Sequence, residues 1–139
     1  MSELSMFFAE NVLADGIEEL VVSERFKDSD GKPIPWKLRW MTEAENEEIR
    51  KSATKRVKVK GQYVQETSPE DYMAKLVVSS VVFPDLKNAA LQNSYGAVGA
   101  DNLLRKMLLP GEYARLIEKV QEINGFDKDL GTLIDEVKN

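Results

Sequence analysis

The chain of 139 residues contains no cysteine and no histidine. The absence of cysteine excludes disulfides and thiol nucleophiles, and it suits a reducing compartment. The absence of histidine removes the commonest general base and the commonest zinc ligand. We therefore predict no catalytic, cofactor-binding or metal-binding residues, and we interpret the protein as a non-enzyme. Chemistry by carboxylates, lysines or tyrosines is the last of the alternatives.

Long apolar runs are also absent. No stretch approaches the roughly 18 consecutive apolar residues that a transmembrane helix needs. The N-terminal sequence MSELSMFFAEN is acidic and has neither the basic region nor the cleavage site of a secretory signal. The net charge of −5 disfavours non-specific binding to nucleic acid or to anionic membranes. We expect neither a membrane nor a nucleic acid as the partner.

The length fits one domain, which we place at residues 1–139. Residues 1–15 either form a short helix or lie loosely. Alternation of apolar and polar residues in ELVVSERF (19–26) and PWKLRWM (35–41) predicts two half-buried strands. The turn-rich sequence KDSDGKPIP between them completes an antiparallel hairpin. Farther along, VKVKGQYVQE predicts either a second, exposed strand pair that turns near Gly61 or a mobile loop.

The rest of the chain shows helical periodicity. Thr42 and Glu45 form a capping-box pattern at the start of a helix over residues 43–54. Ser68 and Pro69 begin a second helix that ends before Pro84, although its β-branched residues also suit a strand. Further helices are predicted over residues 85–96, 100–109, 111–124 and 127–139. The expected fold is α+β: an N-terminal antiparallel hairpin, forming a small sheet, packed with a mainly helical C-terminal half.

A basic stretch, RKSATKRVKVKGQY, covers residues 50–63. One interpretation is nucleic-acid binding, with lysines on phosphates and Tyr63 stacked on a base. The other is a solvated helix end followed by an edge strand whose lysines block unwanted pairing. Four glutamates lie immediately upstream, at positions 43, 45, 47 and 48, and no second aromatic residue lies among the lysines. These two observations favour the second interpretation.

Three other patterns resemble ligand sites weakly. The sequence DSDG begins like a calcium loop, but the twelfth position from Asp28 is Arg39 instead of glutamate, so a hairpin turn is favoured. The pair Gly96 and Gly99 lacks a preceding strand and the full G-x-G-x-x-G pattern, which favours a loop between helices. The four glutamates have no histidine with them and complement the dipole of their helix.

Two apolar features are candidates for contact with a partner. Trp36 and Trp40 share one face of a predicted strand; core packing is the favoured interpretation, and a partner surface is the alternative. The C-terminal segment carries an apolar stripe that docks either on its own domain or on a partner. The stripe consists of Leu130, Leu133, Ile134 and Val137.

Three long segments resemble one protein family, the XkdN-like phage tail assembly chaperones of PBSX-like prophages and of long-tailed phages of Gram-positive bacteria. The segments are VSERFKDSDGKPIPWKLRWMTEAENEEIRKSATK, YMAKLVVSSVVFPDLKNAALQNSYG and LLRKMLLPGEYARLIEKVQEINGF. They cover roughly residues 20–126 and contain no catalytic motif, so the resemblance depends on the length and order of the match.

The resemblance implies an assembly chaperone. Proteins of this kind are expected to bind the long, helical tape measure protein, to help it recruit tail tube subunits, and to be absent from the finished virion. The chain would then act in the cytoplasm of the bacterial host, with the tape measure protein and the tail tube protein as partners and self-association as a further option. The alternatives are a structural tail or connector protein retained in the virion and a small nucleic-acid-binding protein that uses residues 50–60.

Overall fold

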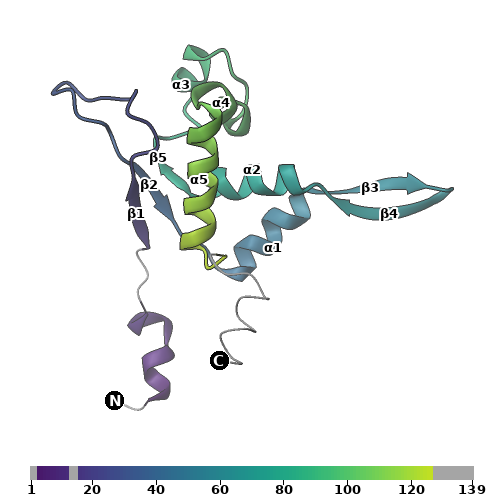
Figure 1. Ribbon diagram of the computed structural model, residues 1–139. Helices are drawn as coiled ribbons and strands as arrows, with labels where there is room; N and C mark the ends of the chain where they lie inside the picture. Colours follow the sequence, from purple (N-terminus) through teal and green to yellow (C-terminus); the bar gives the residue numbers. More distant parts are fainter. Residues whose placement is uncertain (1–2, 13–15, 127–139) are drawn as a thin grey trace, which may run out of the picture.

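The computed structural model describes residues 3–12 and 16–126. Its strands lie between Ile17 and Phe83, with two α-helices among them, and three further α-helices follow (Figure 1). The strands are β1 (Ile17–Leu20), β2 (Trp36–Arg39), β3 (Thr54–Val59), β4 (Gln62–Thr67) and β5 (Val81–Phe83). The α-helices are α1 (Glu43–Ser52), α2 (Pro69–Ser80), α3 (Ala89–Ser94), α4 (Ala100–Met107) and α5 (Pro110–Ile123). Two single-turn 3-10 helices, Leu4–Phe7 and Ala9–Asn11, precede β1.

The first sheet has the order β1-β2-β5. β1 and β2 are antiparallel, as the alternating sequence predicted, with Ile17 opposite Arg39 and Leu20 opposite Trp36. The predicted bounds of the first strand, 19–26, were wrong, because the ladder ends at Leu20. After that point the carbonyl of Val22 accepts a hydrogen bond from Arg115 Nη1 at 2.9 Å, so a side chain of α5 replaces the strand partner.

The predicted turn between these strands is present. The Asp28 carboxylate accepts hydrogen bonds from the backbone N–H groups of Asp30 and Lys32, at 2.8 and 3.0 Å. The N–H of Gly31 donates to the carbonyl of Asp28, and its φ is +79°. The carboxylate that resembled a calcium ligand is therefore occupied in closing an Asx-type turn.

The second long helix ends earlier than predicted. The sequence placed its end just before Pro84, but α2 ends at Ser80 and the next three residues form β5. Val81 and Phe83 pair with Leu38 and Lys37 of β2, so β5 completes the sheet. Consecutive β-branched valines fit this outcome because they pack well on a pleated surface and lose side-chain freedom in a helix.

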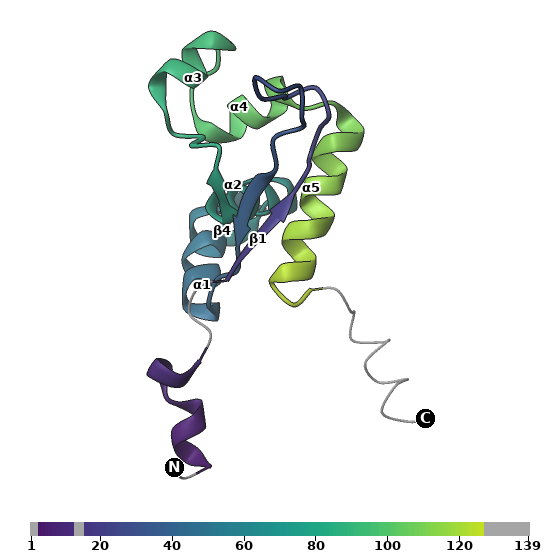
Figure 2. The same ribbon diagram turned by 90° about the vertical axis from the view of Figure 1, so that its left-hand side faces the viewer.

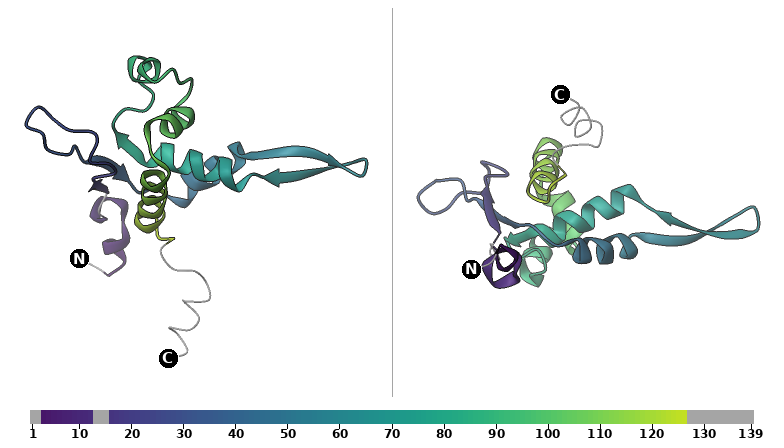
Figure 3. Two further views of the ribbon diagram at one scale, coloured as in Figure 1. Left: turned by 45° about the horizontal axis from the view of Figure 1, so that its top comes forward. Right: turned by 90° about the horizontal axis from the view of Figure 1, so that it is seen from below.

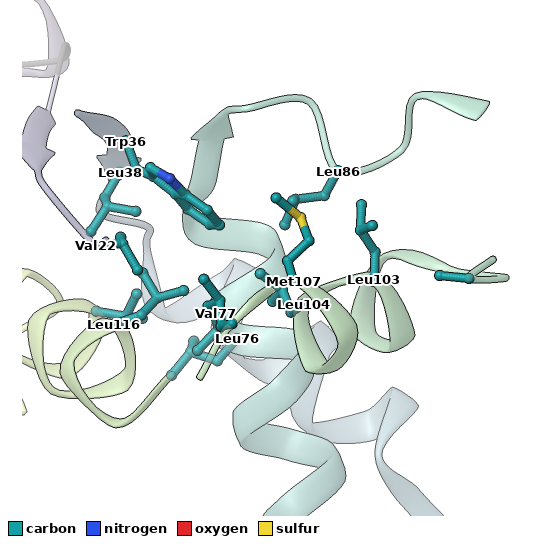
Figure 4. Packing of buried hydrophobic residues seen from close by; sticks show 13 residues of the cluster. Val22, Trp36, Leu38, Leu76, Val77, Leu86, Leu103, Leu104, Met107 and Leu116 are labelled. Atoms are coloured by element: carbon teal, nitrogen blue, oxygen red, sulfur yellow. The ribbon is translucent and has the colours of Figure 1, made fainter. Parts of the chain in front are cut away.

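The buried side chains form one cluster to which most elements contribute (Figure 4). Trp36 and Leu38 enter it from β2, and Leu76 and Val77 enter from α2. Helices α4 and α5 cover α2 with their own apolar faces, and α5 lies alongside the sheet (Figure 2). The residues from these two helices are Leu103, Leu104, Met107, Leu116 and Val120. This packing of a small antiparallel sheet against helices is the α+β arrangement that the sequence predicted.

Strands β3 and β4 form a separate two-stranded ribbon that projects away from the other elements (Figures 1 and 3). Of the two sequence-based options for this segment, the exposed strand pair is therefore present. The turn at Lys60-Gly61 has φ values of +52° and +83°, which is the left-handed geometry of a tight type I′ hairpin. The ribbon, which we call the arm, continues directly from α1 and leads directly into α2.

Candidate partner-binding surface

A small apolar pocket opens between the sheet and the α3–α4 segment. Its volume is about 160 Å³, on the order of the roughly 150 Å³ cavity that holds a benzene molecule in an engineered protein. The lining residues are all apolar or aromatic: Phe26, Ile34, Trp36, Phe83, Pro84, Leu91, Tyr95 and Met107. A pocket of this size and lining suits one apolar side chain of a partner.

The floor and the rim of this pocket differ in exposure. Trp36 and Met107 belong to the buried core, at 2% and 6% exposure, and form the floor. Phe83 and Tyr95 keep 45% and 36% of their surface exposed and form the rim. The rings of Phe26 and Trp36 lie 6.3 Å apart at an angle of 40°. The pocket thus joins buried aromatic surface to solvent-exposed aromatic surface, as interface anchors commonly do.

Cations border the aromatic rings of the pocket. The Arg25 guanidinium lies 5.1 Å from the centroid of Phe26, and the Lys37 ammonium lies 5.8 Å from the centroid of Phe83. Both distances fall within the range of cation–π contacts. The charge of Arg25 is paired with Glu112, so Lys37 is the cation that adds positive charge beside the apolar opening.

A larger cleft of about 750 Å³ lies at the N-terminus of α5, and charged side chains line it together with Val21 and Leu109. Glu112 receives hydrogen bonds from Arg25 Nη2 at 2.6 Å, Arg25 Nε at 3.3 Å and the backbone N–H of Leu109 at 2.8 Å. The hydrogen bonds from Arg25, with further ones from Ser23 and Leu109, lower the pKa of Glu112 to about 2. Because this carboxylate and guanidinium satisfy each other, we assign the cleft a structural role, and the apolar pocket is the candidate binding surface.

The two tryptophans lie in different environments. Trp36 is a core residue that reaches the surface only through the apolar pocket. Trp40 is half-buried one residue beyond β2, where its ring lies against Gly16 and its backbone N–H donates to the carbonyl of Gly16 at 3.2 Å. A Cβ at Gly16 would lie 1.8 Å from the Trp40 ring, so only glycine fits beneath it. The predicted C-terminal stripe at Leu130, Leu133, Ile134 and Val137 lies outside the described residues.

The glycine pair and the glutamates that weakly resembled ligand sites have structural roles. Gly96 and Gly99 lie in the loop between α3 and α4, as the sequence indicated. In the α1 segment, Glu45 pairs with Arg39 at 2.9 Å and Glu48 with Lys51 at 3.6 Å. Within the described residues, no group of three metal-ligating side chains occurs and no helix is long and apolar enough to cross a membrane.

Sequence reasoning did not find the pocket. Its rim residue Phe83 was assigned to a helix, whereas it lies on edge strand β5. Leu91 and Tyr95 belong to α3 and its C-terminal cap, whereas Phe26 lies in the loop between β1 and β2, so their meeting depends on the tertiary fold. The only signal available was the presence of aromatic residues beside predicted turns, which is common to many core positions.

A family model described as "Phage XkdN-like tail assembly chaperone protein" matches residues 4–138. Two similar proteins of Bacillus subtilis (strain 168) are named "Phage-like element PBSX protein XkdN" and "Uncharacterized protein YqbN". The first is 30% identical over 99% of this chain and 94% of its own, and the second is 31% identical over 99% of this chain and 93% of its own.

A solved structure has the same fold. The crystal structure of the protein YqbN superposes with a TM-score of 0.77 and 26% sequence identity. The match covers 91% of this chain and 99% of that one. The similarity therefore extends over nearly the whole length of both chains.

Proposed function

Because the chain belongs to the family of XkdN-like phage tail assembly chaperones, we propose that it reversibly binds the phage tape measure protein and assists assembly of the tail tube around it. The family match over residues 4–138 is the observation that carries this proposal. The protein acts in the cytoplasm of the bacterial host and leaves before the virion is complete. The tail tube protein is its second partner.

The apolar pocket supplies a physical mode of binding. A long helical protein exposes an apolar stripe until it is enclosed, and a groove that accepts single side chains shields such a stripe. The rim residues Phe83 and Tyr95 are exposed enough to contact a helix, and Trp36 forms the floor beneath it. A pocket this small contributes modest affinity per site, which suits a chaperone that must release its partner.

Trp40 and the C-terminal stripe of Leu130, Leu133, Ile134 and Val137 are the further candidate contacts. The stripe has the i, i+3, i+4, i+7 spacing of an amphipathic helix. We propose that it adds a second apolar contact along the same partner. Two weak contacts on one chain raise the overall affinity through effective concentration, without the slow release of one tight contact.

Co-expression with the tape measure protein of the same locus tests the proposal. We expect the tape measure protein to become soluble and to co-elute with this chain in size-exclusion chromatography at moderate salt. Phe83→Ser with Tyr95→Ser should reduce co-elution, whereas Val98→Ser should not, because Val98 is 85% exposed and lies outside the pocket. Truncation before Asp127 tests the C-terminal stripe. A tape measure protein that stays insoluble while this chain elutes alone would contradict the proposal.

A structural tail or connector protein is the alternative function, and its signature is retention in the particle. Mass spectrometry of purified virions separates the two functions. A chaperone should be missing from the virion, whereas a connector should be present in stoichiometric amount.

A further inference from the structure

Among the described residues, the arm touches little besides the helices at its base, where Thr54 of β3 donates to the carbonyl of Arg50 in α1. Every residue of β4 is exposed, and in β3 only Thr54 and Val57 are half-buried. Val59 and Val64 are 49% and 44% exposed and share one face of the ribbon with Val57. A two-stranded hairpin alone is marginally stable in water, so a ribbon of this kind gains stability by docking on another surface.

The charge of the arm is opposite to that of the rest of the protein. Residues 54–67 carry four basic side chains and one acidic side chain, a net charge of +3. Since the whole chain carries −5, the remainder carries −8. The body of a second copy is therefore a surface of complementary charge for the arm.

The backbone of β3 offers an open edge. In a tight two-residue hairpin the closing pair, here Val59 and Gln62, is hydrogen-bonded, and bonded pairs then alternate along the ladder. Val57–Val64 and Lys55–Glu66 are bonded pairs by this alternation. The N–H and C=O groups of Arg56 and Lys58 therefore point outward, ready to pair with another strand.

β1 offers a matching edge of opposite charge. It is terminal in the order β1-β2-β5, and no described strand pairs with its outer side. The hydrogen bond from the Trp40 N–H to the Gly16 carbonyl marks Gly16 and Trp40 as a bonded pair, and bonded and non-bonded pairs alternate along the β1–β2 ladder. The N–H and C=O groups of Ile17 and Glu19 therefore point away from β2, toward the open edge. Antiparallel addition of β3 places Glu19 opposite Arg56 and Ile17 opposite Lys58.

We propose that the β3 edge of the arm pairs with the β1 edge of a second copy, which extends the sheet of that copy by two strands. Edge lysines and arginines disfavour pairing with most strands, and the exposed Glu19 of β1 converts that barrier into selectivity for this one. Glu18 is already paired with Lys119 of its own chain at 3.0 Å. The proposal concerns the chain alone and does not depend on the tape measure protein.

The arm and β1 lie on opposite sides of the molecule (Figure 1). The arm of one chain therefore cannot pair with β1 of the same chain. The contact joins two different surfaces, the arm of one copy and β1 of another. A head-to-tail contact of this type leaves a free arm at one end and a free β1 at the other. Association should therefore continue past the dimer, with average mass rising with concentration unless a ring closes.

Nucleic acid is the competing occupant of a basic ribbon, and two observations disfavour it. The arm has a single aromatic residue, Tyr63, and the Arg56 guanidinium lies over one face of its ring, 4.5 Å from the centroid. The remainder of the chain, at −8, repels a phosphate backbone.

Sedimentation velocity of the full chain tests the proposal. At low salt we expect species whose mass grows with protein concentration, and high salt should shift them toward monomer because it screens the charge pairs. The double variant Arg56→Glu with Lys58→Glu reverses the charge on the β3 edge of the arm. It should weaken association by at least about tenfold. Lys27→Glu with Lys32→Glu changes the net charge equally in the exposed turn and should leave association unchanged.

A charge swap separates specific docking from general repulsion. Glu19→Lys with Lys37→Glu reverses β1 while its cross-strand pair with β2 keeps one charge of each sign. This variant alone should be monomeric, as should the arm variant, but an equimolar mixture should associate again because every arm then meets a β1 of opposite charge. Recovery in the mixture also shows that neither variant is merely unfolded.

Three results would overturn the proposal. The wild type stays monomeric at all concentrations at low salt, the control variant dissociates as much as the arm variant, or the mixture fails to associate. Steeply salt-dependent binding of a labelled DNA duplex by a monomeric wild type, lost in the arm variant, would assign the arm to nucleic acid instead.

Discussion

At the residue scale, Glu112 connects two parts of the chain that are far apart in sequence. Its carboxylate holds Arg25 of the loop between β1 and β2, and it also accepts the N–H of Leu109 at the start of α5. Leu109 has no side-chain acceptor, so Glu112 supplies only the second half of a capping box. Arg25 in addition donates to the carbonyl of Met107 at 2.8 Å. The loop is therefore fixed to the α4–α5 junction mainly by charge-assisted hydrogen bonds.

Acid should weaken this connection. Glu112 has a pKa of about 2 in the folded protein, below its ordinary value of 4.5. Because the carboxyl group has a lower pKa in the folded state than in the unfolded chain, it stabilises the folded state fully at pH values above about 4.5. This stabilisation is lost as the pH falls from about 4.5 toward 2. In urea denaturation at several pH values, Glu112→Gln should reduce stability at neutral pH and flatten the decline over this range.

The partner residue provides a second check of the same interaction. Arg25→Gln removes the main cause of the lowered pKa, so it should flatten the acid decline in the same direction as Glu112→Gln. If either variant keeps the full wild-type decline between pH 4.5 and 2, the acid sensitivity arises elsewhere.

At the element scale, the arm should be less protected from amide exchange than the core helices and the first sheet. Its strands contribute no side chain to the buried cluster, whereas α2 contributes Leu76 and Val77. Local opening therefore costs far less in the arm than in α2. The tight turn depends on Gly61, because a φ of +83° strains any β-branched residue.

Gly61→Val tests the independence of the arm. We expect faster amide hydrogen exchange across β3 and β4, with the urea midpoint of the cooperative transition nearly unchanged. Gly111→Val is the matched variant, because Gly111 lies in α5, needs no positive φ, and has nothing within 4 Å of the position that a Cβ would take. That variant should leave exchange in the arm as it is in the wild type. A large drop in the urea midpoint for Gly61→Val would show that the arm is coupled to the core.

Local patterns in the sequence predicted most elements but not their limits. The Thr42 cap, the turn at Asp28 and the start at Pro69 are visible within four or five residues, and all three are present. The ends of β1 and α2 were misplaced because they depend on distant residues. The Arg115 side chain donates a hydrogen bond to the carbonyl of Val22 where β1 has ended. Val81 pairs with β2 instead of continuing α2.

The candidate site was harder to predict than the fold. Trp36 was identified from alternation alone, and it forms the pocket floor. The pocket itself brings together residues from several separate segments, so no local pattern encodes it. The basic stretch was recognised as an edge, yet its projection from the body follows from the lack of any apolar residue able to reach the core.

At the scale of the whole molecule, one buried cluster joins the sheet to the helices. Leu76, at 1% exposure, lies on α2 between the helical layer and β2 (Figure 4). Leu76→Ala should lower the free energy of unfolding by about 2–5 kcal/mol, because it removes buried methyl groups and leaves a cavity. Val98→Ala, at a side chain that is 85% exposed, should change it by less than about 0.5 kcal/mol.

Circular dichroism and tryptophan fluorescence measure this unfolding in different layers. Trp36 in β2 and Trp40 just beyond it report on the sheet, and the far-ultraviolet signal comes largely from the helices. In Leu76→Ala the two transitions should shift together, because α2 packs against both layers. Separate midpoints would mean that the sheet and the helices unfold as independent units.

The attachment of the arm has a mechanical consequence. One residue, Ala53, separates α1 from β3, and one residue, Ser68, separates β4 from α2, and these two are joined by a backbone hydrogen bond of 3.2 Å. A six-residue strand is about 20 Å long, so a rotation of about 10° at this junction moves the tip by roughly 3–4 Å. The arm thus acts as a lever that pivots next to the first turn of α2. We expect a load on its tip to act on both α1 and α2, and α2 leads directly into β5, which carries Phe83 at the rim of the apolar pocket.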